Sequence, residues 1–538
     1  MKRRLLKVIG ISFLIYVVLS WIIPVGTYSS GELTTNGIDP VGLIDLFNTP
    51  IQAFITFILY GVVFVTIGGL YGVMEKTGAL EKVTDRMGRA FKGKEKGFLI
   101  LTVILFTVLS SVTGLILPLF ALVPLFAAVL FAMNYDKVTV MASTVGSLLV
   151  GSVASTYGFN ITGYTANLLG LDMNNEIVAK VILLVILVIA LIFVVLTSSK
   201  KAMKKELKEA KMEKVEKEVK EVKEVKEVKT AKASATKSAK TTKAASKDSK
   251  KAPKTTKKTT KTTTKKKSTK GKSTTKAFAV AKPVKKVSAK SKISAVPLVI
   301  IFLLMLILCL VGMYNWYYSF GIDVFSNIHE AIMGVEIKGF PIFEHLLSGI
   351  SELGYWSNVE FAGAMVIAAG IIAWIYKLSL NEFIDSFVSG IKKWLPTACL
   401  AALASVILYI LYQASYAGTG TLVDTINAKV FGLTDGFNVL TTGFASLLGS
   451  FFYNDLYYLL ADLSAFVSSF DVASLSVAGL LIQSVYAIGM LIFPTSVVLI
   501  AGLSLFNVSY KEWMKYIWKF ALVAFLLVLL TCGIVTLL

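Results

Sequence analysis

The sequence predicts an all-α membrane protein that crosses the bilayer several times. Of its 538 residues, 55% are hydrophobic, and the mean hydropathy is +0.72, which is too apolar for a soluble enzyme. Long apolar runs alternate with short polar loops, and a helix that spans a bilayer needs about 20 mostly apolar residues. In addition, two of these runs are interrupted near their middle by glycine, proline or hydroxyl-bearing residues.

Residues 1–199 form the first half of the predicted membrane region. A basic start and an apolar run without a cleavage site, Val8–Ile23, predict a retained span with a cytoplasmic N-terminus. Glu75–Lys96 is basic with apolar residues at helical spacing, which predicts an amphipathic helix on the cytoplasmic membrane surface. Gly97–Met133 is either two spans or a re-entrant hairpin. The other apolar segments are Ile51–Met74, whose glycines allow close helix packing, Val138–Leu171 and Ile177–Thr197.

Residues 293–538 form the second half. Tyr314–Tyr355 and Ala414–Asn438 are predicted to be polar loops, and Lys377–Lys393 is predicted to be an amphipathic stretch. Tyr510–Lys519 combines aromatic and basic residues in a way that is typical of a membrane interface. The apolar segments of this half are Ile293–Met313, Trp356–Tyr376, Leu395–Gln413, Val439–Val467, Val477–Leu505 and Phe520–Leu538.

Residues 200–292 are a lysine-rich insert between the two halves. They contain 34 lysines and 9 acidic residues, whereas the rest of the chain has 21 basic and 24 acidic residues, so the formal charge of +22 comes from the insert. Lys200–Lys229 is typical of a charged helix or coiled coil, and the remainder is too poor in apolar residues to fold. The charge predicts a cytoplasmic insert, which either contacts a polyanion or serves as a solvated spacer.

The two halves share one order of elements. In each, a glycine-containing span leads to an amphipathic stretch, then to interrupted apolar segments, then to a broken polar helix. Gly69–Lys82 also aligns weakly with Gly370–Phe383. Two such halves are typical of a secondary transporter. The sequence does not decide whether the halves are inverted.

The polar stretch Gly151–Gly170 is the first candidate binding site. Glycines and short polar side chains in mid-span interrupt a helix, and the freed carbonyls and amides can hold ions and carboxylates near the bilayer midplane. The alternative is that the hydroxyls bond back to helix carbonyls and join neighbouring helices. We favour a site, because polar residues at mid-membrane are usually functional. The candidate residues are Ser155, Thr156, Gly158, Asn160 and Thr162.

The second half contains two further candidates. Pro494, Thr495 and Ser496 interrupt Val477–Leu505 and predict either a matching helix break or an ordinary proline kink. Asp455 with Asn454 lies in an apolar run, where a carboxylate needs a partner such as a coupling cation or a cationic substrate, for example a basic amino acid. The alternative for this pair is a tight turn between two helices at the membrane surface.

Enzymatic chemistry and a resident cofactor are not expected. Cys309, Cys399 and Cys532 lie in apolar runs without paired spacing, and both histidines lie in one polar loop, so neither a disulfide framework nor a metal site is predicted. No Walker motif occurs, which argues against coupling to ATP. No lysine or arginine lies deep in a predicted span. An anionic substrate would therefore be held by helix N-termini, hydroxyls and a bound cation, either Na⁺ or a proton.

Six segments carry a resemblance to a known family. They are Trp21–Tyr28, Pro40–Leu43, Ile67–Leu80, Ser155–Asn160, Pro494–Ser496 and Tyr510–Trp513. Together they resemble the YfcC-like permeases of the anaerobic four-carbon-dicarboxylate carrier group, within the ion transporter superfamily. The resemblance covers both membrane halves and skips the insert. It implies two pseudo-symmetric repeats, each with a re-entrant hairpin and a broken helix. It also implies cation-coupled uptake or exchange of small carboxylates, amino acids or peptides by an elevator motion.

Both hairpin tips depart from the pattern of that family. Thr113–Phe120 has no acidic residue where the family has a polar, acidic tip, and Phe452–Tyr458 is bulky where the family has small residues. These departures imply either a different substrate or a loss of transport. We predict a secondary transporter of the bacterial plasma membrane that binds a small carboxylate or amino acid, as a monomer or a homodimer. The alternative is a non-transporting scaffold whose insert tethers nucleic acid, ribosomes or anionic lipid.

Overall fold

The computed structural model describes residues 2–29, 31–199, 294–468 and 470–538. The described residues on either side of the insert form one compact unit. In these ranges the regular elements are helices and two short antiparallel hairpins, β1–β2 and β3–β4. The lysine-rich insert lies outside the described residues, so its expected helix and its polyanion contacts stay predictions.

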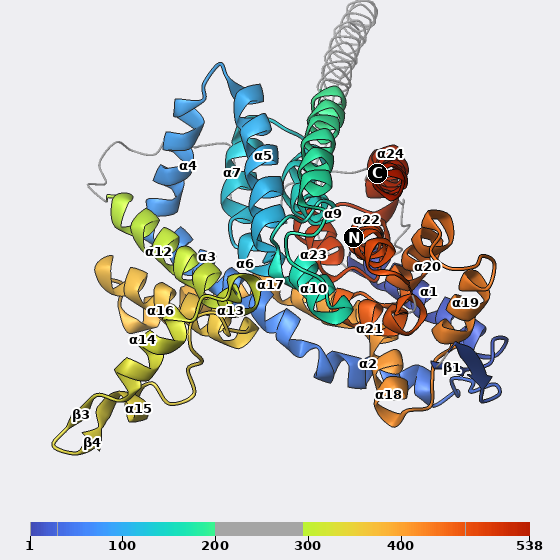
Figure 1. The fold of residues 1–538 in the computed structure, drawn as a ribbon. Helices are drawn as coiled ribbons and strands as arrows, with labels where there is room; N and C mark the ends of the chain where they lie inside the picture. Colours follow the sequence, from blue (N-terminus) through green and yellow to red (C-terminus); the bar gives the residue numbers. More distant parts are fainter. Residues whose placement is uncertain (1, 30, 200–293, 469) are drawn as a thin grey trace, which may run out of the picture. The chain divides into compact units, whose positions relative to one another are not determined.

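The first half begins with α1 and the β1–β2 hairpin and ends with the long helix Ile177–Ser199 (Figure 1). Its broken helix contains two π-helical turns, Ala142–Gly146 and Phe159–Gly163. The elements are α1 (Lys2–Ser20), β1 (Gly26–Ser29), β2 (Glu32–Thr35), α2 (Asp45–Thr56), α3 (Ile58–Thr77), α4 (Ala79–Ala90), α5 (Glu95–Thr113), α6 (Ile116–Phe120), α7 (Val123–Ala132), α8 (Lys137–Met141), α9 (Ser147–Val153), α10 (Tyr164–Leu169) and the helix Ile177–Ser199.

The second half begins after the insert and ends with the long helix α24. Its elements are α12 (Val296–Met313), α13 (Trp316–Phe320), α14 (Val324–Met333), β3 (Glu336–Ile337), β4 (Phe340–Pro341), α15 (Ile342–Leu346), α16 (Asn358–Ile375), α17 (Leu380–Leu403), α18 (Val406–Ala417), α19 (Leu422–Phe431), α20 (Val439–Phe452), α21 (Leu456–Val467), α22 (Val472–Ile492), α23 (Val497–Phe506) and α24 (Tyr510–Leu537).

Seven helices in the described ranges are long and apolar enough to cross a membrane, or eight if the bent pair α17–α18 counts as one span. The prediction of an all-α protein with several membrane spans is therefore confirmed. α1 forms as a helix but is not one of the seven. Its basic residues Lys2, Arg3, Arg4 and Lys7 lie within the helix itself, which shortens its apolar part. The seven are α3, α5, Ile177–Ser199, α12, α16, α22 with α23, and α24.

Several segments differ from the predicted boundaries. Ala414–Asn438 is not only a loop, since it contains α19, which begins with a capping box: the Thr421 side chain accepts from the N–H of Asp424, and the Asp424 carboxylate accepts from the N–H of Thr421. Tyr314–Tyr355 contains α13–α15 and the β3–β4 hairpin. The predicted interface belt and the last span form one helix, α24.

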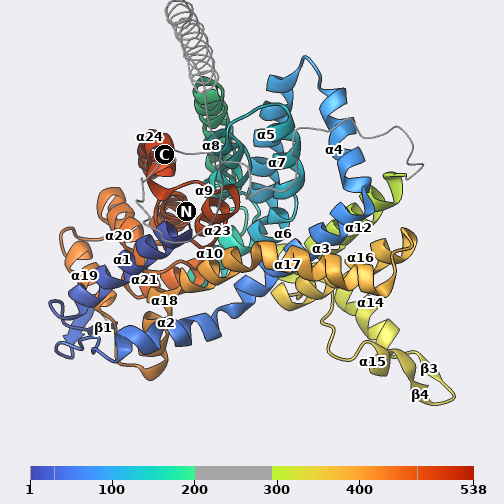
Figure 2. The same ribbon diagram turned by 180° about the vertical axis from the view of Figure 1, so that it is seen from behind.

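Glycines allow α3 and α17 to lie side by side in close contact (Figure 2). A Cβ atom at Gly72 would lie 2.2 Å from the carbonyl oxygen of Ser386, and one at Gly390 would lie 2.1 Å from the carbonyl oxygen of Gly68. These distances leave no room for a side chain, so the two backbones meet directly. The glycines of the predicted span Ile51–Met74 thus have the packing role that the sequence indicated.

In the first half, a helical hairpin ends against the break of the broken helix. α5 and α6–α7 form the hairpin, and a Cβ atom at its tip residue Gly114 would lie 2.9 Å from the Cα of Gly158. The Ser111 hydroxyl donates to the Ala154 carbonyl at 2.6 Å, and the Thr156 N–H donates to the Ser111 carbonyl at 3.0 Å. The broken helix continues past this point through α10. The tip therefore stops level with the break, which favours the re-entrant alternative for Gly97–Met133.

The second half repeats this arrangement. α20 and α21 form a hairpin, and its tip residue Asn454 donates from Nδ2 to the Thr495 carbonyl at 2.8 Å and to the Ser405 hydroxyl at 2.9 Å. The Tyr486 hydroxyl donates to the Asn454 carbonyl at 2.9 Å. Thr495 lies in the break between α22 and α23, and Ser405 lies in the bend between α17 and α18. The second tip is therefore tied to the second break.

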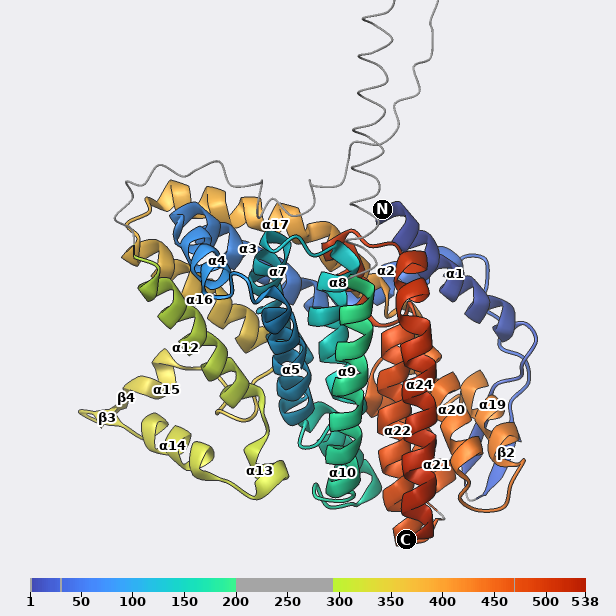
Figure 3. The ribbon, with the colours of Figure 1, turned by 90° about the horizontal axis from the view of Figure 1, so that it is seen from above.

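The two broken helices run in opposite directions. Figure 3 shows α8, α9 and α10 following one another from top to bottom. At the start of α8, Lys137 Nζ donates to the Asn507 carbonyl beyond α23 at 3.0 Å and pairs with Glu512 at 3.2 Å. Beyond the end of α10, Glu176 accepts from the hydroxyl of Ser476, near the start of α22, at 3.0 Å. Each broken helix thus begins where the other ends, and the halves are inverted.

Candidate functional site

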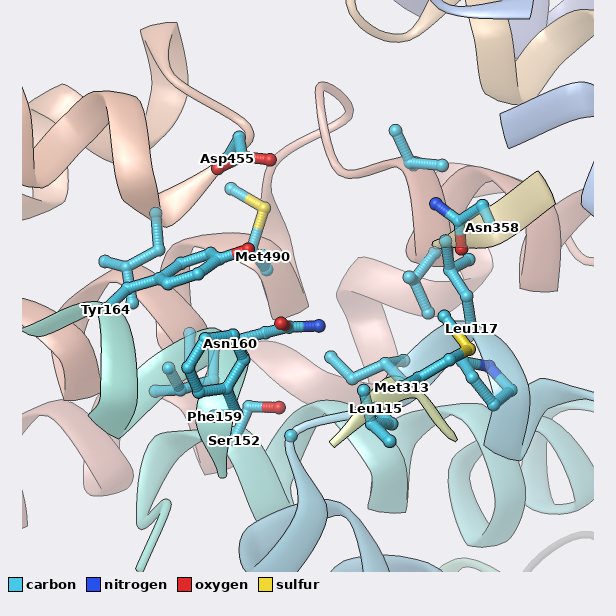
Figure 4. A pocket seen from close by; sticks show the side chains of 18 of the residues that line it. Leu115, Leu117, Ser152, Phe159, Asn160, Tyr164, Met313, Asn358, Asp455 and Met490 are labelled. Atoms are coloured by element: carbon cyan, nitrogen blue, oxygen red, sulfur yellow. The ribbon is translucent and has the colours of Figure 1, made fainter. Parts of the chain in front are cut away.

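A cavity of about 480 Å³ lies where the two hairpin tips and the two helix breaks converge (Figure 4). Its volume is within the range of pockets that bind small molecules. Tyr60 of α3 and the segment 354–358 at the start of α16 add to the wall. The matching segments from the two halves are Gly114–Pro118 and Asn454–Leu456 at the tips, and Phe159–Ile161 and Ser496–Val498 at the breaks.

Asn160 points its side-chain amide into the cavity (Figure 4). It lies in the π-helical turn Phe159–Gly163 that follows the first break, and Gly158 is the N-cap of this turn. Among the described residues, no protein group forms a hydrogen bond with this amide. An asparagine amide carries two donors and one acceptor oxygen. The Asn160 amide is therefore free to donate a hydrogen bond to a ligand or to accept one from it.

The other four candidates of the first break lie beside the cavity and join the break to the hairpin. The hydroxyls of Ser155 and Thr156 each donate to the Ser111 carbonyl at 3.3 Å, and the Thr162 hydroxyl donates to the Ser155 carbonyl at 2.9 Å. Gly158 provides the close approach to Gly114. These contacts are of the kind that the alternative interpretation predicted, in which the hydroxyls bond to helix carbonyls and join neighbouring helices. A direct role of these four residues in binding stays a prediction.

Asp455 and Asn454 form the second tip, and both line the cavity. Asp455 caps α21, since its Oδ1 accepts from the Tyr457 N–H at 3.0 Å. The pair is therefore a tight turn, as one interpretation held, but the turn packs against a helix break. Among the described lining residues, Asp455 is the one charged side chain; none is lysine, arginine or histidine.

Pro494, Thr495 and Ser496 form the break between α22 and α23. Of the three, Ser496 lines the cavity, and its hydroxyl caps α23 by accepting from the Leu499 N–H at 3.2 Å. The Thr495 carbonyl is occupied by Asn454. The Thr495 hydroxyl is buried and has no hydrogen-bond partner within the described ranges. The segment is a helix break that matches the first one in position.

Several polar lining residues were not among the candidates from the sequence, including Tyr60, Tyr164 and Asn358. Figure 4 shows Tyr164 on the same side of the cavity as Asp455, and Asn358 across the cavity from both. A tyrosine or asparagine in an apolar helix has the same sequence neighbours whether it faces a cavity or another helix. Apolar side chains complete the wall, among them Leu115, Leu117, Phe159, Met313 and Met490.

Helix N-termini supply further donors at the cavity. α16, α21 and α23 each begin at lining residues, and the first N–H groups of a helix have no partner within it, so they favour an anion. At α21 the carboxylate of Asp455 already fills this role, so the N-terminus of α23, which is capped by the neutral hydroxyl of Ser496, is better suited to a bound anion. Lys180 is buried at 4% exposure in the first turn of Ile177–Ser199, but it is not a lining residue. The cavity thus offers amides and helix N-termini for a carboxylate, and one carboxylate, Asp455, for a cation.

A comparison with protein families agrees with a carrier. The sequence profile described as "DcuC: C4-dicarboxylate anaerobic carrier" matches residues 3–239 and 259–538. A solved structure with a similar chain is that of the YdaH transporter of Alcanivorax borkumensis, described as having an unusual topology. It shares 13% sequence identity at a TM-score of 0.36, over 98% of this chain and 97% of that chain. No curated protein gives a significant sequence match.

Proposed function

Because the chain belongs to the C4-dicarboxylate anaerobic carrier family, we propose that it is a secondary transporter that moves a small carboxylate-bearing solute together with a cation. The observation that carries this proposal is the cavity shared by two inverted halves. Each half contributes a hairpin tip and a helix break to it, and transporters bind substrates and coupling ions at such breaks. No covalent step is involved.

The lining residues support a division of roles within the cavity. The N-terminus of α23 and the free amide of Asn160 would hold the substrate carboxylate. Asp455 would face a cation, either a coupling ion or the ammonium group of an amino acid or peptide. A dicarboxylate without such a cation would add two negative charges next to Asp455, and this repulsion favours a substrate that arrives with a cation. The substrate class is therefore a carboxylate, an amino acid or a short peptide.

We place the protein in the plasma membrane of a bacterium, with its N-terminus and residues 200–292 in the cytoplasm. Basic residues in α1, in α4 and in the insert support this orientation, since short cytoplasmic segments carry an excess of lysine and arginine. A homodimer and a polyanion partner for the insert stay predictions.

A non-transporting scaffold is the second candidate. The observation that favours it is the apolar first tip, where Leu115, Leu117 and Pro118 line the cavity in place of polar groups. Deleting residues 200–292 separates the two functions. A transporter keeps its transport without the insert, whereas a tether loses its polyanion binding.

The first experiment is thermal stabilisation of the purified full-length protein by dicarboxylates, amino acids and dipeptides, with and without Na⁺ and at acidic and alkaline pH. A compound at a hundred times its dissociation constant adds about 2.7 kcal/mol to the stability of the folded state. The expected result is stabilisation that disappears in Asn160→Ala and persists in Asn327→Ala, a matched change at an exposed position of α14. Stabilisation by no compound, together with binding of DNA or anionic vesicles, would overturn the transporter in favour of the scaffold.

A further inference from the structure

The segment that connects the spans α12 and α16 projects sideways from the other helices. Figures 1 and 2 both show α14, α15 and the β3–β4 hairpin at the outer edge of the molecule, beyond α12 and α16. We call residues 322–350 the arm. No residue of the arm is buried. The arm therefore has no core of its own and is not packed into the helices around the cavity.

The arm exposes large apolar side chains along its whole length. Contiguous exposed apolar surface of this kind marks a site of interaction with a protein or a membrane. Exposure is 49% at Ile328 in α14, 55% at Ile337 in the hairpin and 69% at Leu346 in α15. The full set is Ile322, Val324, Ile328, Ile332, Val335, Ile337, Phe340, Phe343, Leu346 and Ile350.

In α14 these side chains share one face of the helix. Val324, Ile328 and Ile332 recur every four residues, which places them above one another on a helix. Glu330 lies two residues from Ile328 and from Ile332, so it is on the opposite face. α14 is therefore amphipathic, although the composition of residues 314–355 indicated a polar loop.

The β3–β4 hairpin separates apolar from acidic side chains in the same way. Ile337 pairs with Phe340, so both side chains point to one side of the hairpin. Glu336, which precedes Ile337 in the strand, points to the other side because successive side chains of a strand alternate. The apolar face of the arm thus extends from the helix into the hairpin.

The arm lies beside membrane-spanning helices and at their depth. α12 and α16, which precede and follow it, are both long and apolar enough to cross a membrane. In Figure 3, where α24 runs from top to bottom, α15 and the β3–β4 hairpin lie level with the lower part of α12. α12 itself exposes apolar residues such as Ile300, Leu304 and Ile307. The arm is therefore next to a surface that faces lipid.

Charge favours lipid over a second copy of the chain as the partner. The arm contains four acidic residues and one basic residue, so its formal charge is −3 with neutral histidines. In a two-fold dimer the same patch of both copies meets, so two arms in contact would bring like charges together. Acyl chains require only that the acidic side chains stay off the apolar face, as Glu330 and Glu336 do.

We propose that the arm is an interfacial anchor whose apolar face inserts among lipid acyl chains. Because one crossing of the membrane by α12 separates the arm from the insert, the arm occupies the leaflet opposite the insert. Amphipathic segments lie in the membrane plane and bury apolar side chains at the boundary between headgroups and acyl chains. At this boundary the unpaired edges of the β3–β4 hairpin can still bond to water or headgroups. The proposal does not depend on the proposed transport function.

The base of the arm is bonded to the wall of the cavity. The Tyr314 hydroxyl donates to the Tyr157 carbonyl at 2.7 Å, next to the first break. The N–H groups of Gly354 and Trp356 donate to the Gly312 carbonyl at 2.6 and 2.9 Å, and both residues line the cavity. Insertion of the arm therefore attaches this side of the cavity to the bilayer.

Spin labels on the two faces of α14 test the insertion. The purified full-length variants Ile328→Cys and Glu330→Cys are labelled and reconstituted into phosphatidylcholine vesicles, each in a Cys399→Ala background because Cys309 and Cys532 are buried. Power saturation measures how often each label collides with O₂, which concentrates in acyl chains, and with a nickel chelate, which stays in water. We expect the label at position 328 to collide more with O₂ and the label at position 330 to collide more with the chelate.

Ile337→Cys and Glu336→Cys repeat the comparison on the hairpin, with the same expected difference. All four positions are exposed, so the substitutions should leave the fold intact. More collisions with the chelate than with O₂ at position 328 or 337 would place the arm in water. Few collisions with either reagent at these positions would place the apolar face against protein, such as a second copy of the chain. Each of these results would overturn the anchor, whether or not the protein transports a solute.

Discussion

Replacing Gly390 by alanine tests the contact between α3 and α17. The added Cβ would lie 2.1 Å from the Gly68 carbonyl oxygen and 2.8 Å from its carbonyl carbon. Both are backbone atoms of a neighbouring helix, so no side-chain rotation relieves the overlap. To restore an ordinary carbon–oxygen contact, the two helices have to move apart by about 1 Å. Such overpacking typically costs about 1–3 kcal/mol, and we expect the upper end because the whole helix has to move.

The same substitution at Gly370 is the matched control. Gly370 lies within α16, and a Cβ atom there would meet nothing within 4 Å. Alanine at that position should be neutral or stabilising, since glycine in a helix interior is about 1 kcal/mol less favourable. The apparent melting temperature of each purified variant is compared with that of the wild type. If Gly390→Ala melts together with Gly370→Ala, the close helix contact is refuted.

Three further predictions concern the tips and the helix termini. Gly158→Ala would place a Cβ 2.9 Å from the Cα of Gly114, so it should lower both the melting temperature and the stabilisation by substrate, and unchanged stabilisation would contradict the tip contact. Asn454→Leu removes two hydrogen bonds worth about 1 kcal/mol each and should weaken substrate binding in the stabilisation assay; binding equal to that of the wild type would contradict a role of these two bonds in holding the second tip at the cavity. Hydrogen bonds from the N–H and hydroxyl of Ser474 lower the pKa of Asp471. Its contribution to stability is therefore present above about pH 4 and lost as the pH falls below that value, so Asp471→Ala should melt below the wild type at neutral pH and match it in acid, as a melting series over pH would record.

The sequence identified the elements of the site better than its residues. Glycine and hydroxyl residues at 151–170 and Pro494 mark both helix breaks, because an interrupted helix needs such residues wherever it occurs. The hydroxyl of Ser155 binds the Ser111 carbonyl, 44 residues away in the chain. Asn160 faces the cavity. Ser155 and Asn160 are both polar residues of one short stretch. Only the position of the hairpin determines that Ser155 contacts the hairpin and that Asn160 faces the cavity.

Other features depend on contacts that no local pattern contains. The inversion of the halves is shown by pairs such as Lys137 with Glu512, which lie 375 residues apart. Tyr60 reaches the cavity from α3, in a span whose glycines indicated only packing. α19 is different, since its capping box from Thr421 to Asp424 is visible in the sequence. The surrounding glycines and polar residues indicated a loop. The prediction followed this composition and not the capping box, so it missed the helix.

The charge of the cavity explains why substrate and cation would move together under the proposed function. Asp455 is its one charged lining residue in the described part of the chain, and an ionised carboxylate without a cationic partner costs several kcal/mol in a region of low dielectric. An empty carrier with an ionised Asp455 would bear this cost in any intermediate that is closed to both sides. A carboxylate substrate alone would increase it. Under the proposed function, a cation bound at Asp455 together with the substrate would remove the excess charge. The fully loaded form would then cross the closed state most readily, and this difference in barrier would couple the two fluxes.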